Sequence, residues 1–290
     1  MAAIPAGTVT GAGSDGVFIT GRNLTMSAFT MAKYETTYQL WKEVYDWAAT
    51  KGYTFANAGK EGYPYAGSGE DGTGTDDPAE WTAAERKSRP VTMINWRDAI
   101  VWRNAYSELT GKQPVYYTDS TYGTVLKVST DDGGNATAAD TAVMKSGANG
   151  YRLPTGAEWE YAARGGNQGD SANWGYTYAG SETEGDVAWY DVNAYDVGNT
   201  DPAYGARPAG TKDANSAVLY DLSGNVFEWC WDWSETITSS TPADGAASGS
   251  NRVMRGGCWY YGASSRAVAY RDYACPDVRY DYLGFRVVCP

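Results

Sequence analysis

The last forty residues constrain the fold most, because they alternate two kinds of sequence. The stretches 252–259 (RVMRGGCW) and 283–288 (LGFRVV) combine Gly, Arg and apolar residues and are typical of a rigid framework. Tyr, Ser, Asp and Ala dominate the segment between them. Tyrosine supplies rigid amphipathic contact area and small polar residues supply adaptable hydrogen bonds, as in antibody paratopes. This pattern indicates a binding surface on a fixed scaffold, with a ligand-binding region over about 252–288.

An alternative interpretation of the same segment is a half-buried sheet face, because Tyr alternating with polar residues also fits such strands. A core face would use Leu and Ile, whereas the branched aliphatic residues between 260 and 282 are Val268 and Val278 alone. We therefore expect an exposed surface that can form hydrogen bonds.

The composition excludes several classes of function. The formal net charge of −12 argues against nucleic acid and anionic membranes as partners. The chain has no His, which excludes Ser-His-Asp and Cys-His catalysis and His-ligated zinc. No apolar run approaches the roughly 20 residues of a transmembrane helix, and residues 1–13 lack the apolar core of a signal peptide. We expect a monomer.

The cysteines do not indicate a metal or redox site. Cys230, Cys258, Cys275 and Cys289 have spacings that match no CxxC pattern. Four cysteines in 290 residues are not needed to hold the fold, so we expect free thiols. The chain is long enough for a substantial core and shows no linker, so we predict a single domain over residues 1–290.

Local signals predict little regular structure. Capping residues and apolar periodicity predict helices over about 37–50, 95–109 and 155–165. Residues 115–149 are expected to be a β-hairpin insertion with a strand at 124–128 and a turn at 131–135, and residues 56–77 a surface loop. Aromatic residues make up 14% of the chain, which suggests a core of large rings. Trp229, Trp231 and Trp233 are expected to mark a core-facing strand edge; stacking on sugars is the alternative.

Four ordered motifs carry a family resemblance. They are YRLPTGAEWEYAAR at 151–164, LYDLSGNVFEW at 219–229, RGG at 255–257 and GFR at 284–286. Together they resemble the formylglycine-generating enzyme (sulfatase-modifying factor) family. This resemblance implies an α+β chain with a variant of the C-type lectin fold: small antiparallel sheets, two main helices and much irregular structure.

The enzymes of that family oxidise a substrate cysteine, using two active-site cysteines and copper. The matching positions in this chain are Tyr261 and Arg266. Copper(I) needs soft sulfur ligands, which tyrosine and arginine cannot supply. We therefore predict a protein that is not an enzyme and requires no cofactor. A formylglycine-generating-type oxidase with displaced cysteines is the alternative, and an accessory subunit that binds sulfatase-like substrates is a third hypothesis.

The C-terminal pattern is also similar to the variable proteins of diversity-generating retroelements, in which an error-prone reverse transcriptase rewrites codons at template adenines. The resemblance implies a hypervariable, receptor- or adhesin-like protein that binds an unknown protein or glycan. It also implies a lipoprotein on the bacterial cell surface, anchored in the outer membrane. The residues predicted to vary and bind are Tyr260, Tyr261, Gly262, Ser264, Ser265, Tyr270, Asp272, Tyr273, Ala274, Cys275, Val278, Tyr280, Asp281 and Tyr282.

The resemblance also implies at most one structural calcium ion. The matching ligands are the side chains of Asp221 and Glu228 and the carbonyl groups of Gly224 and Val226. Hard cations prefer such oxygen ligands. In the alternative, Asp221 and Glu228 only accept hydrogen bonds from turn amides and neighbouring arginines.

Overall fold

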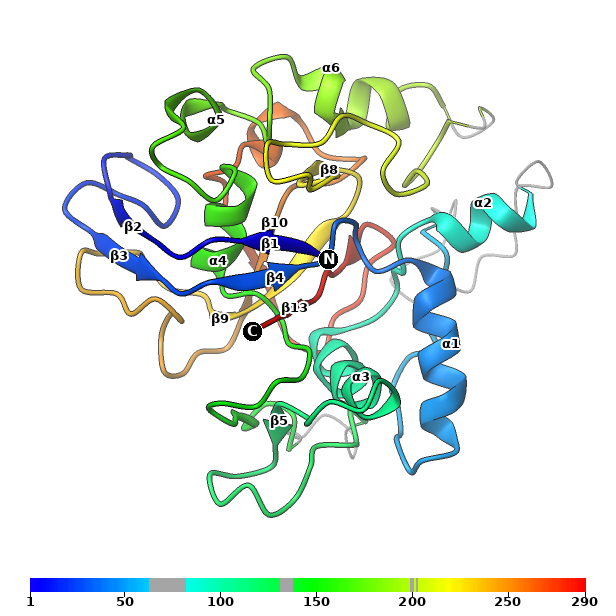
Figure 1. Cartoon of the computed structure of the whole chain (residues 1–290). Coiled ribbons are helices and arrows are strands. Elements are labelled where there is room, and N and C mark those ends of the chain that lie inside the picture. The colour runs from blue at the N-terminus through cyan, green and yellow to red at the C-terminus, as the bar shows by residue number, and fades with distance from the viewer. Residues whose placement is uncertain (63–81, 131–137, 199–200, 202) are drawn as a thin grey trace.

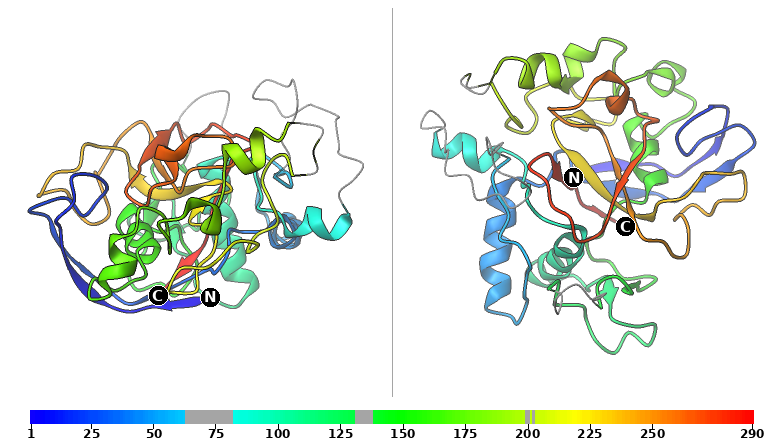
Figure 2. Two further views of the ribbon diagram at one scale, coloured as in Figure 1. Left: turned by 90° about the horizontal axis from the view of Figure 1, so that it is seen from above. Right: turned by 180° about the vertical axis from the view of Figure 1, so that it is seen from behind.

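The two ends of the chain meet in one small sheet. In this computed structural model, which describes residues 1–62, 82–130, 138–198, 201 and 203–290, strand β4 (Phe29–Met31) lies between β1 (Ala2–Ile4) and β13 (Val288–Cys289). Both pairs are antiparallel. The termini consequently lie close together in every view (Figures 1 and 2).

A four-stranded sheet carries most of the C-terminal framework. Its order is β11 (Asp272–Ala274), β10 (Arg252–Arg255), β9 (Phe227–Trp233) and β12 (Leu283–Gly284). Strand β10 is antiparallel to both β9 and β11, whereas β12 is parallel to β9. In the right-hand view of Figure 2, the orange-to-red chain of the last forty residues crosses the middle of the molecule.

The remaining sheets are two-stranded ladders. They are β2 (Gly7–Thr10) with β3 (Asn23–Met26), β5 (Tyr116–Tyr117) with β6 (Val143–Met144), and β7 (Ala188–Trp189) with β8 (Ser223–Gly224). The β7–β8 pair is parallel, like β9–β12. Most strand pairs are antiparallel, as predicted, and these two parallel pairs join segments that long irregular connections bring together.

The three predicted helices are confirmed. Helix α1 (Tyr38–Ala49) begins where the Thr37 side chain accepts a hydrogen bond from the Leu40 amide. Capping boxes start α3 (Trp96–Leu109) at Asn95 and α4 (Gly156–Ala163) at Thr155. These sites satisfy amide groups that the first helical turn leaves unpaired.

Short helical turns fill the irregular regions. They are α2 (Ala83–Ser88), α5 (Ser171–Gly175), α6 (Glu184–Val187), a π-helical turn at Asp191–Tyr195 and a 3-10 turn at Ala263–Arg266. No helix in the described ranges is long and apolar enough to cross a membrane.

The expected strand at 124–128 is wrong. Residues in this stretch form only isolated bridges, Tyr117 with Val125 and Thr54 with Val128. The ladder of the insertion is instead β5 with β6, because Asn104 of α3 binds the Tyr116 amide and carbonyl and orients this edge. The turn predicted at 131–135 and most of the loop at 56–77 lie outside the described residues.

Large rings form the core, as the composition predicts. Five tryptophans are fully buried: Trp41, Trp96, Trp102, Trp159 and Trp229. Trp41 stacks on Trp102 with ring centroids 5.8 Å apart, and Phe285 meets both rings edge-on. On β9 the burial decreases outward, from buried Trp229 to the half-buried rings of Trp231 and Trp233.

Candidate functional site

Two glycines turn the chain out of the framework sheet. After β10, Gly256 and Gly257 have φ angles of +93° and +72°, a region that side chains disfavour. A Cβ atom on Gly257 would lie 2.7 Å from the carbonyl oxygen of Ser265 and from Cγ of Arg266. The turn packs tightly against the returning chain, and residues 260–264 are exposed beyond it.

Four tyrosine rings gather beyond this turn. Tyr261 lies with its ring centroid 5.4 Å from that of Tyr260 and 5.5 Å from that of Tyr282. Tyr282 stacks on Tyr280 at 4.9 Å with nearly parallel planes. Tyr260 and Tyr261 are 42% and 38% exposed. We call Tyr260, Tyr261, Tyr280 and Tyr282 the tyrosine cluster; it combines residues from both ends of the predicted variable segment.

The structure distributes the fourteen predicted binding positions over three levels of exposure. Exposed positions are Tyr260, Tyr261, Gly262, Ser264, Tyr273 and Cys275. Half-buried positions are Tyr270, Asp272, Ala274, Val278, Tyr280, Asp281 and Tyr282. Ser265 is buried, and its hydroxyl donates to the carbonyl oxygen of Gly262 at 2.9 Å. Ser265 therefore supports the turn, and its prediction as a ligand contact does not fit this position.

Sequence reasoning missed two tyrosines from another segment. Tyr195 meets Tyr260 edge-on with centroids 4.6 Å apart, and Tyr204 lies 5.6 Å from Tyr195. Both rings also contact Trp259. They come from a Gly-, Asp- and Asn-rich stretch without periodicity, so only their aromatic character signalled a packing role. The surface beside Tyr260 thus includes residues outside the predicted variable segment.

Three tyrosines of the predicted segment have raised pKa values. The neighbouring Tyr195 and partial burial raise the pKa of Tyr260. Burial and a hydrogen bond that its hydroxyl donates to Tyr261 raise the pKa of Tyr282. Burial and the nearby Asp272 carboxylate raise the pKa of Tyr270. Each phenol can therefore both donate and accept a hydrogen bond.

A buried arginine holds the backbone of the variable segment. Arg255, at the end of β10, pairs with Glu160 of α4 at 2.6 Å, and both side chains are inaccessible to solvent. Its guanidinium also donates to the carbonyl oxygens of Val268 at 2.9 Å and Ala269 at 3.1 Å, and to that of Tyr270. Since these contacts bind only main-chain atoms, side chains on this segment can change without disturbing them.

Arg266, at one of the two positions that match the family's active-site cysteines, forms buried ion pairs. Arg266 is 1% exposed, and its guanidinium pairs with Glu184 and lies 3.3 Å from Asp191. The same guanidinium donates to the carbonyl oxygen of Tyr261 and lies over the Tyr190 ring. A filled, charge-paired site therefore occupies this part of the fold.

The cysteines do not replace the missing thiols. All four are free, Cys275 is exposed, and Cys230, Cys258 and Cys289 are buried. Burial raises the pKa of Cys230 well above its usual range and also raises that of Cys258. The thiolate is the reactive and metal-binding form of cysteine, so these two thiols are poorly suited to either role.

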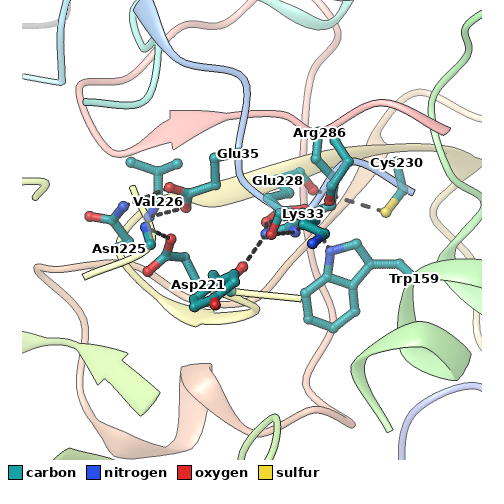
Figure 3. Close-up of polar contacts among 12 residues, drawn as sticks. Lys33, Glu35, Trp159, Asp221, Asn225, Val226, Glu228, Cys230 and Arg286 are labelled. Carbon is teal, nitrogen blue, oxygen red and sulfur yellow. Dashed lines mark hydrogen bonds and ion pairs between the residues drawn. The ribbon is translucent and has the colours of Figure 1, made fainter. Parts of the chain in front are cut away.

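The predicted calcium ligands face other partners (Figure 3). Oδ2 of Asp221 accepts the Gly210 amide at 2.6 Å. Both carboxylate oxygens of Glu228 accept from the Arg286 guanidinium, and one also accepts from the indole of Trp159. The Arg286 side chain is fully buried with Glu228, so its cation balances this carboxylate.

The calcium ion at this set stays a prediction: Arg286 already balances Glu228, whereas Oδ1 of Asp221 is buried without a hydrogen-bond partner. Gly224 and Val226 lie on the same turn; the amide of Val226 donates to Glu35 at 3.1 Å, and its carbonyl oxygen is the predicted ligand. No group of three or more His, Cys, Asp or Glu side chains within the described ranges is arranged to hold a metal ion. The contacts of Asp221 and Glu228 are instead the turn amide and the arginine of the alternative expectation.

The comparisons with known proteins agree with this architecture. Residues 1–290 match the sulfatase-modifying factor enzyme 1-like domain, so the chain belongs to that family. "Chaperone protein LppX" of Paenibacillus barcinonensis is 32% identical over 86% of this chain and 75% of its own length. The formylglycine-generating enzyme of Streptomyces coelicolor is 37% identical over 47% of this chain, and the chain spans about half the length of that enzyme (46%).

Solved structures show the same fold. Treponema denticola variable protein 1 superposes with a TM-score of 0.73 and 30% identity, covering 100% of this chain and 94% of that protein. CarF superposes with a TM-score of 0.73 and 26% identity, covering 100% and 97%. The α+β fold is thus the C-type lectin fold of the formylglycine-generating-enzyme type, as predicted, and the resemblance to a retroelement variable protein is also confirmed.

Proposed function

We propose that this protein is a non-catalytic, receptor- or adhesin-like binding protein whose residues 260–282 form a hypervariable face. The observation that carries this proposal is the tyrosine cluster, partly exposed and mounted on a buried framework. Arg255 fixes the backbone of 268–270 through carbonyl groups alone. A face built this way can exchange its side chains while the fold persists.

The chemistry of the face suits recognition of a protein or glycan. Tyrosine offers a flat apolar ring and a polar hydroxyl at low entropic cost, and Tyr273, 56% exposed on β11, extends this chemistry. The phenols of Tyr260 and Tyr270, whose pKa values are raised, both donate and accept hydrogen bonds. Nucleic acid is a poor partner for a chain of net charge −12.

The formylglycine-generating relatives supply the alternative, oxidation of a sulfatase cysteine. Here Tyr261 and Arg266 stand at the two cysteine positions, and Arg266 is buried against Glu184. Those contacts support binding without chemistry. The alternative is tested by incubating the protein with copper and a cysteine-containing sulfatase-motif peptide; aldehyde detected by mass spectrometry would favour it.

The proposal includes a location: a monomeric lipoprotein at the bacterial cell surface, anchored in the outer membrane. Similarity to Treponema denticola variable protein 1 over the whole chain motivates this part. It is tested by surface labelling of intact cells and by fractionation of membranes.

Population sequencing of the gene tests the hypervariable face directly. Substitutions should concentrate in codons 260–282, at positions matching adenines of a nearly identical template copy in the flanking DNA. Codons 96–109, which encode the buried helix α3, are the matched control and should stay constant. A uniform 3′ end without a template would contradict the proposal.

A further inference from the structure

Two adjoining cavities lie beside the outer tryptophans of β9, away from the tyrosine cluster residues. They measure about 480 and 580 Å³, within the usual range of small-molecule sites. Both are lined by Asp140, Thr141, Trp233 and Ala247, and the smaller one also by Trp231. The loop at 242–250 contributes to the lining of both cavities, and a bridge between Ala246 and Trp233 joins it to β9. We call this pair of cavities the tryptophan groove.

A buried arginine without a carboxylate partner lines the groove. Arg252 is 2% exposed, and its guanidinium lies 3.7 Å from the ring centroid of Trp96 and 3.3 Å from that of Trp233. Nη1 donates to the carbonyl oxygen of Trp231 at 2.6 Å, whereas Nε is buried without a hydrogen-bond partner. In the described chain Arg252 forms no ion pair. Burial lowers its pKa to about 9, which reflects this uncompensated position.

Burying a cation without a paired anion costs free energy, and a hydrogen-bond acceptor for its N–H groups would lower that cost. The rings of Trp96 and Trp233 cover the guanidinium, and the smaller cavity gives access to the side chain. An oxygen-bearing ligand in that cavity would supply the missing acceptor. The buried guanidinium of Arg252 therefore favours the binding of an oxygen-bearing ligand in the groove.

The charges around the groove favour a neutral ligand. Arg97 and Arg252 contribute two positive charges, and Asp140, Asp244 and Asp277 contribute three negative charges, which leaves one net negative charge. Arg97 already pairs with Asp140 at 2.6 Å. Because the whole chain also carries −12, an anion would meet repulsion on approach.

From this geometry we propose that the tryptophan groove binds a neutral saccharide. Trp233 offers the apolar surface on which the C–H face of a sugar ring packs. Sugar hydroxyls both donate and accept, so they match Arg252 as donor and the Asp244 carboxylate as acceptor. Thr141, Ser248 and Ser250 add hydroxyl groups to the lining. Cys275 and Asp277 of the segment 260–282 line one edge of the larger cavity, whereas none of the four tyrosine cluster residues lines either cavity.

Titration of the intact protein with neutral disaccharides tests the proposal. Cellobiose, lactose, maltose and diacetylchitobiose would be added while tryptophan emission and heats of binding are recorded. We expect saturable binding of at least one of them. Asp244→Ala should weaken it about tenfold, the loss of one charge-assisted hydrogen bond. Asp244 is exposed, so this variant should fold normally.

Matched variants identify the site. Asp213→Ala removes an exposed carboxylate elsewhere and should leave binding unchanged. Trp233→Ala should abolish binding, and Tyr261→Ala should not alter it, which separates this proposal from the variable face. Absence of binding by every neutral disaccharide, binding of digalacturonate alone, or affinity unchanged in both Asp244→Ala and Trp233→Ala would each overturn the inference.

Discussion

Glu160→Ala should lower the free energy of unfolding more than a substitution of an exposed residue does, because Glu160 supports the backbone of the variable segment. The carboxylate is buried, and it pairs with Arg255 at 2.6 Å and with Arg164 at 3.0 Å. It also accepts the amide of Val17 at 2.9 Å. Truncation would leave Arg255 buried without its counter-charge.

The expected loss of unfolding free energy follows from these contacts. Removing one partner of a buried ion pair costs roughly 3–5 kcal/mol. Arg255 keeps its carbonyl acceptors at Val268 and Ala269, which places the loss near the lower bound. The pair with Arg164, which is 15% exposed, adds at most about 1 kcal/mol. A total of about 4 kcal/mol corresponds to a Tm lowered by about 7 °C for a chain of 290 residues.

Thermal and urea unfolding followed by circular dichroism would measure this loss. Hydrogen exchange should also accelerate in the segment 268–270, because its carbonyl clamp loosens. Glu43→Ala is the control on the exposed face of α1 and should change stability by less than about 0.5 kcal/mol. Equal unfolding free energies for the two variants, with unchanged exchange at 268–270, would refute this reasoning.

Two further predictions concern pH and metal. Burial raises the pKa of Asp232 from 3.8 to about 6, although the Gly156 amide donates to it; the folded state therefore binds more protons than the unfolded state between pH 4 and 6. The contribution of Asp232 to the unfolding free energy should fall by about 3 kcal/mol as pH rises through this window. Because burial also raises the pKa of Asp221 to about 6 and raises that of Asp98, Asp232→Asn should reduce the slope by the Asp232 contribution alone in urea titrations at pH 4, 5, 6 and 7. Because Arg286 already balances Glu228, adding calcium or EDTA should change the Tm by less than about 1 °C. A calcium-dependent rise of several degrees would instead show that the protein binds a calcium ion.

The sequence predicts the segment that forms the binding surface, but not the exposure of each residue in it. The residues 260–282 were selected by composition, and most of them are exposed or half-buried. Composition cannot distinguish Ser264 from Ser265. In the 3-10 turn, Ser264 is exposed whereas Ser265 is buried. Nor can composition assign Tyr195 to the surface, because 65 residues of chain separate it from Tyr260.

The sequence alone determined the features that act over a few residues. Caps at Thr37, Asn95 and Thr155 predict the starts of three helices, because each side chain bonds an amide three residues ahead. The ordered motifs likewise predict the family and its fold. Each of these signals lies within a few consecutive residues, so it can be recognised without knowing which distant residues pack against it.

Only the tertiary structure decided the partners of buried charges. Glu228 faces Arg286 across 58 residues and Arg252 faces tryptophans instead of a carboxylate. Both outcomes depend on which side chains the packed fold brings within a few ångströms of the buried charge. The desolvation of a charge, and therefore the role of each residue, arises only once the chain has closed around it.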